Sequence, residues 1–126
     1  MTTYRGLGNL SAPLKQRIEL SVRKVVLEVF TGVVMKSPVR TGRFRGAWVV
    51  DNNPLAPALL DRFDETGSET IRAAVRRLRA MPFNGQPTYI VNPLPYAQRL
   101  EHGWSSQAPV GMVRLTLTEI ASRYGA

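Results

Sequence analysis

The longest apolar pattern in the chain predicts an amphipathic helix. Apolar residues recur every three or four positions and so share one side of a helix: Leu14, Ile18, Val22, Val25, Val29 and Val33. Ser11 followed by Pro13 is a typical start, because a serine hydroxyl can cap the first turn and proline fits there. Pro38 ends the pattern, since the residue before a proline avoids the helical conformation. We therefore expect a helix from Ala12 to Met35.

Two stretches predict strands. Residues 47–51 and 88–92 are rich in β-branched and aromatic side chains, and each is followed by a proline-containing stop. A sheet of only two strands is marginal by itself. Either the pattern misses further strands, or another copy of the chain completes the sheet.

Three shorter segments predict further helices. Thr66 and Glu69 form a T-x-x-E capping box before a helix expected from Ser68 to Ala80. Residues 95–103 favour one or two helical turns closed by a glycine, and residues 110–124 favour a last helix. Alternating apolar and polar positions inside the last segment would also fit a strand.

These elements predict one α+β domain over residues 1–126. A long N-terminal helix should pack on a small β-sheet, with further helices around it. We expect residues 1–11 to form an arm and residues 54–67 a mobile loop. The length suits a single domain with its own core.

The charge balance points to an anionic partner. The formal net charge is +8, from fourteen arginines and three lysines against nine acidic residues. Such an excess suggests nucleic acid or an acidic protein surface, although it can also serve solubility alone. Arg72, Arg76, Arg77 and Arg79 belong to one predicted helix and could contact DNA phosphates; a solvated helix face is the alternative. No aromatic residues interleave with them to stack on bases.

The sequence offers little for catalysis. There is no cysteine and a single histidine, His102, so neither a nucleophile–base pair nor a histidine-rich metal site is expected. Asp61, Asp64 and Glu65 suggest a solvated acidic loop rather than a calcium site. No nucleotide-binding glycine motif is complete. We expect no enzyme activity, no metal and no cofactor.

The chain shows no sign of membrane insertion. No apolar run is long enough to span a bilayer, and the first ten residues lack the apolar core of a signal peptide. We therefore expect no membrane partner and synthesis in the cytoplasm.

Two segments carry a family resemblance. The run SPVRTGRFRGAWVV and the later run YIVNPLPYAQRLEHGWSSQAPVGMV resemble the tail-completion, or head–tail joining, family of long-tailed phages. The matching residues are Pro38, Thr41, Gly42, Arg45, Trp48, Tyr96, Ala97, Glu101 and Gly103. Two features depart from the pattern: His102 stands between Glu101 and Gly103, and residues 54–86 contain an additional helix.

The resemblance implies a structural protein of the virion neck or tail end, made in the host cytoplasm. Members form a homo-oligomeric ring, usually hexameric, around the DNA path. The implied partners are other copies of the chain, a head connector or stopper protein, and a tail terminator or tail tube protein. Genomic DNA in the channel could be a further partner. The alternative function is a small basic nucleic-acid-binding module that uses the helix of Arg72 to Arg79.

The matched residues suggest roles in assembly. Pro38, Thr41 and Gly42 should fix a tight corner between helix and strand, with Gly103 closing a later turn. The corner could present three arginines to an acidic neighbour, and two aromatic side chains could anchor the core or a subunit contact. Glu101 could pair with an arginine within the subunit or across the ring. These interface candidates are Arg40, Arg43, Arg45, Trp48, Tyr96 and Glu101. Alternatively, the corner is only a connection within a monomer.

Overall fold

The structure is a computed structural model that describes residues 11–53, 61–82, 86–103, 105–108 and 110–125. The arm predicted at the N-terminus therefore lies outside the described residues, except for Ser11. The first part of the predicted mobile loop, residues 54–60, also lies outside them.

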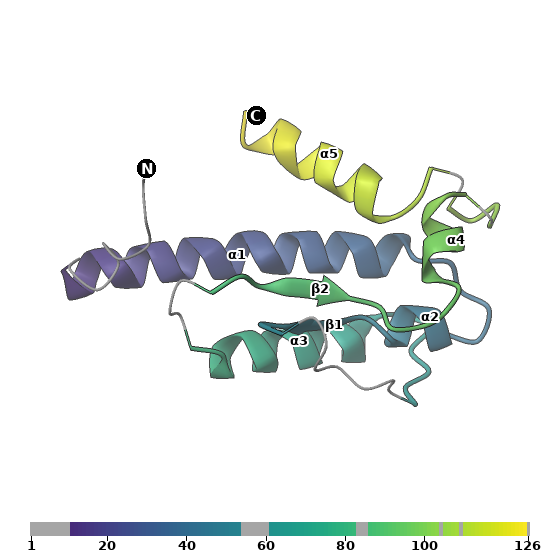
Figure 1. Ribbon diagram of the computed structural model, residues 1–126, viewed down its shortest axis with the longest axis horizontal. Coiled ribbons are helices and arrows are strands. Elements are labelled where there is room, and N and C mark those ends of the chain that lie inside the picture. Colours follow the sequence, from purple (N-terminus) through teal and green to yellow (C-terminus); the bar gives the residue numbers. More distant parts are fainter. Residues whose placement is uncertain (1–10, 54–60, 83–85, 104, 109, 126) are drawn as a thin grey trace.

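The described chain has a mixed α+β composition (Figure 1). The elements are α1 (Ala12–Lys36), α2 (Arg43–Gly46), β1 (Val49–Asp51), α3 (Ser68–Ala80), β2 (Tyr89–Val91), α4 (Ala97–Glu101) and α5 (Val113–Arg123). The bounds of α3 match the prediction, and α1 ends one residue later than expected. The Ser11 hydroxyl accepts a hydrogen bond from the Leu14 amide at 3.4 Å, as a helix-capping serine does. Residues 113–123 form a helix and not a strand.

The two strands form a small antiparallel sheet that packs with α1 and α3. Val49 pairs with Val91, Val50 with Ile90 and Asp51 with Tyr89. The helices α1 and α3 contact each other directly, and α3 also contacts β1. In Figure 1, α5 lies on the side of α1 that faces away from the strands. The core lies where α1, β1 and α3 meet, and its buried side chains include Phe30, Val33, Val34, Trp48, Val50, Ala74 and Leu78.

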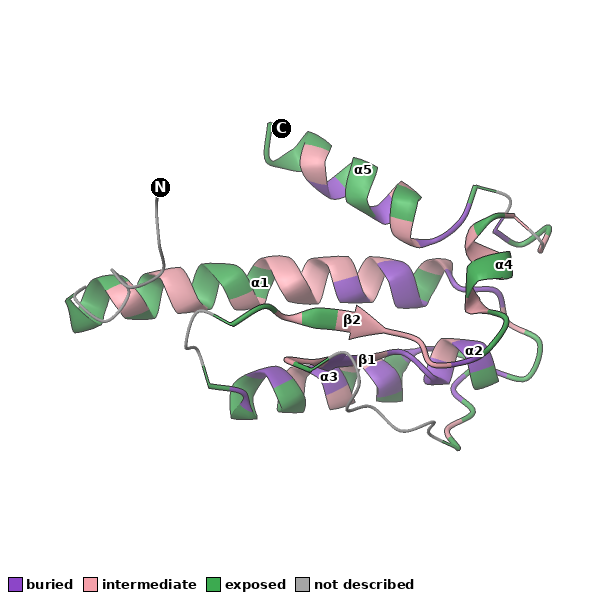
Figure 2. Ribbon diagram, in the orientation of Figure 1, coloured by how far each residue is buried: buried purple, intermediate pink, exposed green. Residues whose placement is uncertain are grey.

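The buried side of α1 coincides only in part with the stripe that the sequence pattern predicts: its C-terminal end, Val29 and Val33, lies at the core. Phe30, Val33 and Val34 are fully buried, whereas Leu14 and Val22 of the predicted stripe are 44% and 39% exposed. The N-terminal part of α1 extends past the sheet and α3, and it is mostly coloured as exposed or half-buried in Figure 2. The C-terminal half carries apolar residues on two sides. Tertiary contacts therefore bury only the C-terminal end of the predicted stripe, together with Phe30 and Val34 beside it.

The predicted first strand begins later than expected. Gly42 has a positive φ of 85° and precedes the short helix α2, which the sequence analysis did not predict. Ala47 still has helical backbone angles, so extended backbone starts at Val49 and Trp48 lies just before the strand. The cause is the Thr-Gly turn, which leads the chain into a helical turn before the strand can start.

Among the helices of the described chain, none combines the length and the apolar character of a membrane-spanning segment.

Candidate functional site

The corner between α1 and β1 is held from inside by Ser37 and Trp48. The buried Ser37 hydroxyl donates to the Val33 carbonyl at 2.8 Å and accepts a hydrogen bond from Trp48 Nε1 at 2.7 Å. Trp48 is 5% exposed and meets Phe44 edge-to-face, with ring centroids 5.8 Å apart. Of the two roles left open for Trp48, the structure places the side chain in the core of its own chain.

Arg45 completes the same corner. Its guanidinium donates to the carbonyls of Met35 and Ser37 at 3.1 and 2.9 Å, and to that of Glu65 at 2.7 Å. Burial lowers the pKa of Arg45, while the nearby Asp64 carboxylate opposes this shift. The arginine thus satisfies carbonyl groups at the end of α1, which have no partner within that helix. The sequence analysis expected Arg45 to face an acidic neighbour; in the structure it is bound within its own chain.

Gly42 lets the corner approach the segment before α3. A Cβ atom at this position would lie 2.7 Å from the amide nitrogens of Asp64 and Glu65. The Asp64 amide donates to the Gly42 carbonyl at 3.0 Å. A residue with a side chain would meet both backbone strain and a steric clash here.

Asp64, and not the predicted capping box, caps α3. Its carboxylate accepts hydrogen bonds from the Gly67 and Thr70 amides at 3.0 and 2.7 Å and from the Thr70 hydroxyl at 2.7 Å. The N-cap residue is Gly67, so Thr66 lies one position too early to cap with its partner Glu69. Burial opposes ionisation of Asp64, but these hydrogen bonds outweigh it and lower its pKa. The expectation of a solvated acidic loop is therefore wrong for Asp64, which is only 7% exposed.

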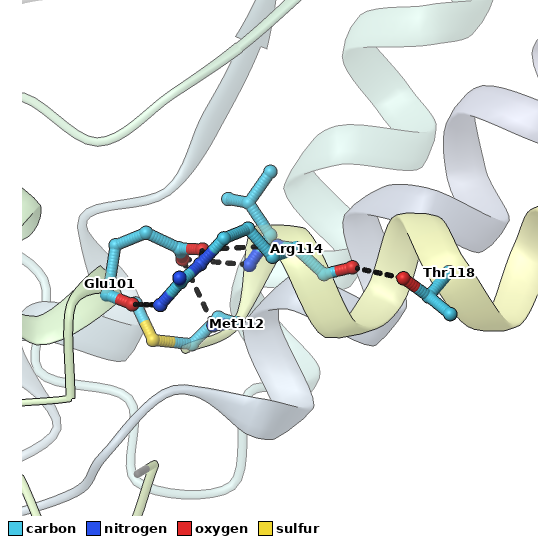
Figure 3. Close-up of polar contacts among 5 residues, drawn as sticks. Glu101, Met112, Arg114 and Thr118 are labelled. Carbon is cyan, nitrogen blue, oxygen red and sulfur yellow. Dashed lines mark hydrogen bonds and ion pairs between the residues drawn. The ribbon is translucent and has the colours of Figure 1, made fainter. Parts of the chain in front are cut away.

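Glu101 has a similar role at α5 (Figure 3). Its carboxylate accepts hydrogen bonds from the Met112, Val113 and Arg114 amides at 2.9, 2.8 and 3.0 Å. Arg114 Nε also lies 3.1 Å from the carboxylate. Burial opposes ionisation, yet the hydrogen bonds lower the pKa of Glu101. Its arginine partner lies within the subunit, which is one of the two arrangements expected from the sequence.

Gly111 and Gly103 let the chain pass closely around Glu101. Gly103 has a φ of 88° just after α4, where the sequence analysis expected a closing turn. A Cβ atom at Gly111 would lie 2.4 Å from the Glu101 carbonyl oxygen. The segment between α4 and α5 is therefore anchored at both ends on Glu101.

The outer surface of the corner carries the remaining interface candidates. Arg40 and Arg43 are exposed, and their guanidinium groups have no hydrogen bond or ion pair with another described residue. Tyr96 is 39% exposed and its ring packs at 5.9 Å against Phe44. Pro38 is buried beneath this surface. Of the six interface candidates, three are therefore bound within their own chain, namely Arg45, Trp48 and Glu101. The other three, Arg40, Arg43 and Tyr96, are exposed.

Arg62 was missed by sequence reasoning. Its guanidinium donates to the carbonyls of Gly46 and Trp48 at 2.8 and 3.0 Å, on the α3 side of β1. A hollow of about 210 Å³ adjoins it, lined by residues of α1, β1 and α3. Burial lowers the pKa of Arg62, while the Glu69 carboxylate opposes this shift. No local pattern marks Arg62, because its partners lie more than ten positions away.

The described residues contain no candidate metal site. No group of three or more histidine, cysteine or acidic residues lies close enough to hold a metal ion in the described ranges. His102 is exposed at the end of α4. A second hollow, of about 460 Å³, lies between α1 and α5, and its charged groups include the Lys36–Glu119 ion pair.

Comparison with known proteins found no matching family model, no matching curated protein and no matching solved structure.

Proposed function

We propose that the chain is a structural protein of a phage neck or tail end, which forms a homo-oligomeric ring that joins the tail tube to the head connector around the DNA channel. The family resemblance of the corner and of residues 89–113 suggests this role. The single structural observation that supports it best is the small size of the sheet. Its two strands have three residues each, and β2 has no strand neighbour other than β1 in the described chain. A strand edge of this kind can bind an extended segment of a neighbouring subunit.

A row of apolar side chains on α1 supports assembly as well. Leu14 and Val22 are exposed, and Ile18 between them is only half-buried. Residues at these spacings share one side of a helix, so the row forms a continuous apolar strip. Contiguous exposed apolar surface favours contact with another protein. Head-to-tail contacts between identical chains close into a ring when the rotation between subunits fits.

The exposed corner residues would then face a neighbouring protein. Arg40 and Arg43 are unpaired within the described chain and could meet acidic groups of an adjacent subunit, the head connector or a tail protein. Tyr96 offers an aromatic ring that is already fixed by Phe44, so its burial would cost little side-chain entropy.

A measurement of mass and copy number tests this function. Phage particles would be assembled with a tagged chain, and copies per particle counted by quantitative mass spectrometry. Light scattering would give the mass of the free protein. We expect a fixed low copy number per particle, equal to one ring. A chain that is absent from purified particles, or present as a solitary copy, would contradict the proposal.

A further inference from the structure

None of the nine acidic residues forms an ion pair with Arg72, Arg76 or Arg79 of α3. All nine lie in the described ranges, and five of them form ion pairs: Glu19 with Arg23, Glu28 with Arg123, Asp51 with Arg77, Glu101 with Arg114 and Glu119 with Lys36. Asp64 is used in capping α3. The other three, Asp61, Glu65 and Glu69, precede α3 or lie in its first turn. The acidic residues near α3 thus gather at its first turn, and beyond that turn Arg77 is the one arginine of the helix with an acidic partner among the described residues.

Three arginines form an unpaired row on α3. Arg72, Arg76 and Arg79 follow one another at intervals of four and three residues, so they lie on one side of the helix. All three are exposed, and no hydrogen bond or ion pair joins them to another described residue. Arg77 differs from them, because its Nη2 atom lies 3.2 Å from Asp51 Oδ2. The four arginines grouped by sequence thus divide into a free row of three and one that is paired.

The row lacks the apolar anchor that a protein partner would need. The exposed residues of α3 are Ser68, Glu69, Arg72, Arg76, Arg77, Arg79 and Ala80. The large exposed apolar side chains of the described chain all belong to other segments. Protein interfaces depend on buried aromatic or aliphatic anchors, whereas a phosphate backbone requires only cations. The composition of this face therefore favours nucleic acid over an acidic protein.

The length of the row fits a DNA strand. Seven residues separate Arg72 from Arg79, which corresponds to about 10 Å along the helix and to about three phosphates of one strand in duplex DNA. No aromatic side chain is exposed on α3 to stack on unpaired bases. We propose that Arg72, Arg76 and Arg79 bind the backbone of double-stranded DNA without reading its sequence. This contact does not depend on the ring, and within a ring it would hold DNA against the subunit.

Salt-dependent DNA binding tests the proposal on the purified full chain. Fluorescence anisotropy would measure affinity for two 20-base-pair duplexes of unrelated sequence over a range of salt concentrations. We expect equal affinity for both duplexes. The triple variant R72Q/R76Q/R79Q should reduce the slope of log affinity against log salt by about 2–3, since each lost phosphate contact removes about 0.9. The variant R72K/R76K/R79K should keep most of the slope.

A matched control separates this site from net charge. The variant K15Q/R17Q/K24Q removes the same charge from α1, where none of the three residues has an ion pair with a described residue. We expect its slope to change by less than about one. Equal effects of the two triple variants would overturn the proposal. It would also be overturned if the α3 variant kept DNA binding but lost binding to poly-glutamate, which would indicate a site for acidic protein. Circular dichroism would verify that each variant is folded.

Discussion

Asp64 shows how much of the local structure depends on one side chain. Its carboxylate accepts hydrogen bonds from the amides of Gly67 and Thr70 and from the Thr70 hydroxyl, all in buried surroundings. Replacing a cap and leaving buried donors unpaired costs about 1–3 kcal/mol. We expect Asp64→Asn to lower the free energy of unfolding by that amount, measured by urea denaturation at pH 7. The neighbouring Asp61 is exposed, so Asp61→Asn should change little; a comparable loss there would contradict the capping role.

The two capping carboxylates also predict acid sensitivity. The folded-state pKa values of Asp64 and Glu101 are lowered from ordinary values of 3.8 and 4.5. A lowered folded-state pKa adds stability above the ordinary pKa, and this contribution is lost as pH falls through the folded-state value. The free energy of unfolding should therefore be nearly constant from pH 7 to 5 with respect to these groups and fall below pH 4.

Glu101→Gln separates this effect from general acid denaturation. The variant should be less stable than the parent at pH 7, and it should lose less stability between pH 5 and pH 3. Glu65→Gln is the matched control, because Glu65 is exposed and no hydrogen bond of its carboxylate to another described residue is found. If both variants follow the same pH curve as the parent, the hydrogen bonds of Glu101 do not set the acid limit.

At the scale of elements, the junction between α1, α2 and the start of α3 depends on a glycine. Gly42 has a φ of 85°, and a side chain would lie 2.7 Å from two backbone nitrogens. We expect Gly42→Ala to lower the free energy of unfolding by more than the 1–2 kcal/mol that a left-handed residue alone costs. Gly125→Ala is the control: its φ is 72° and its Cβ would meet nothing within 4 Å. Equal losses for both variants would show that strain alone matters at Gly42.

Local signals predicted the elements better than they predicted contacts. The capping serine predicted the start of α1, and proline stops predicted the ends of α1 and α3 within a residue, because these signals act on the adjacent backbone. The start of α3 was predicted correctly from Thr66 and Glu69, although Asp64 caps the helix instead. The repeat on α1 predicted only part of the buried side, since α3 and the sheet select which residues of α1 are covered. Arg45 and Arg62 were unpredictable for the same reason: their partners are carbonyl groups distant in the sequence. Sequence alone thus suggested that Arg45 faces an acidic neighbour, whereas in the structure it is half-buried and donates to carbonyl groups of its own chain.

At the scale of the whole molecule, the apolar row on α1 should decide assembly. Leu14 is 44% exposed and Ile18 is half-buried on the same side of the helix. Under the proposed ring, Leu14→Asp combined with Ile18→Asp should leave the chain folded but reduce its copies per phage particle to background. Leu20→Asp should leave incorporation unchanged, because Leu20 is 58% exposed on a different side of α1. Normal incorporation of the double variant would exclude this row as an assembly contact.

Arg62 limits how another chain can approach the sheet next to β1. Its guanidinium already occupies the Gly46 and Trp48 carbonyls on the α3 side of β1, so an incoming chain finds its first hydrogen-bonding groups taken there. A chain that paired with the residues just before β1 would first have to displace this guanidinium. A side chain that contacts no partner protein thus influences where the small sheet can accept another strand.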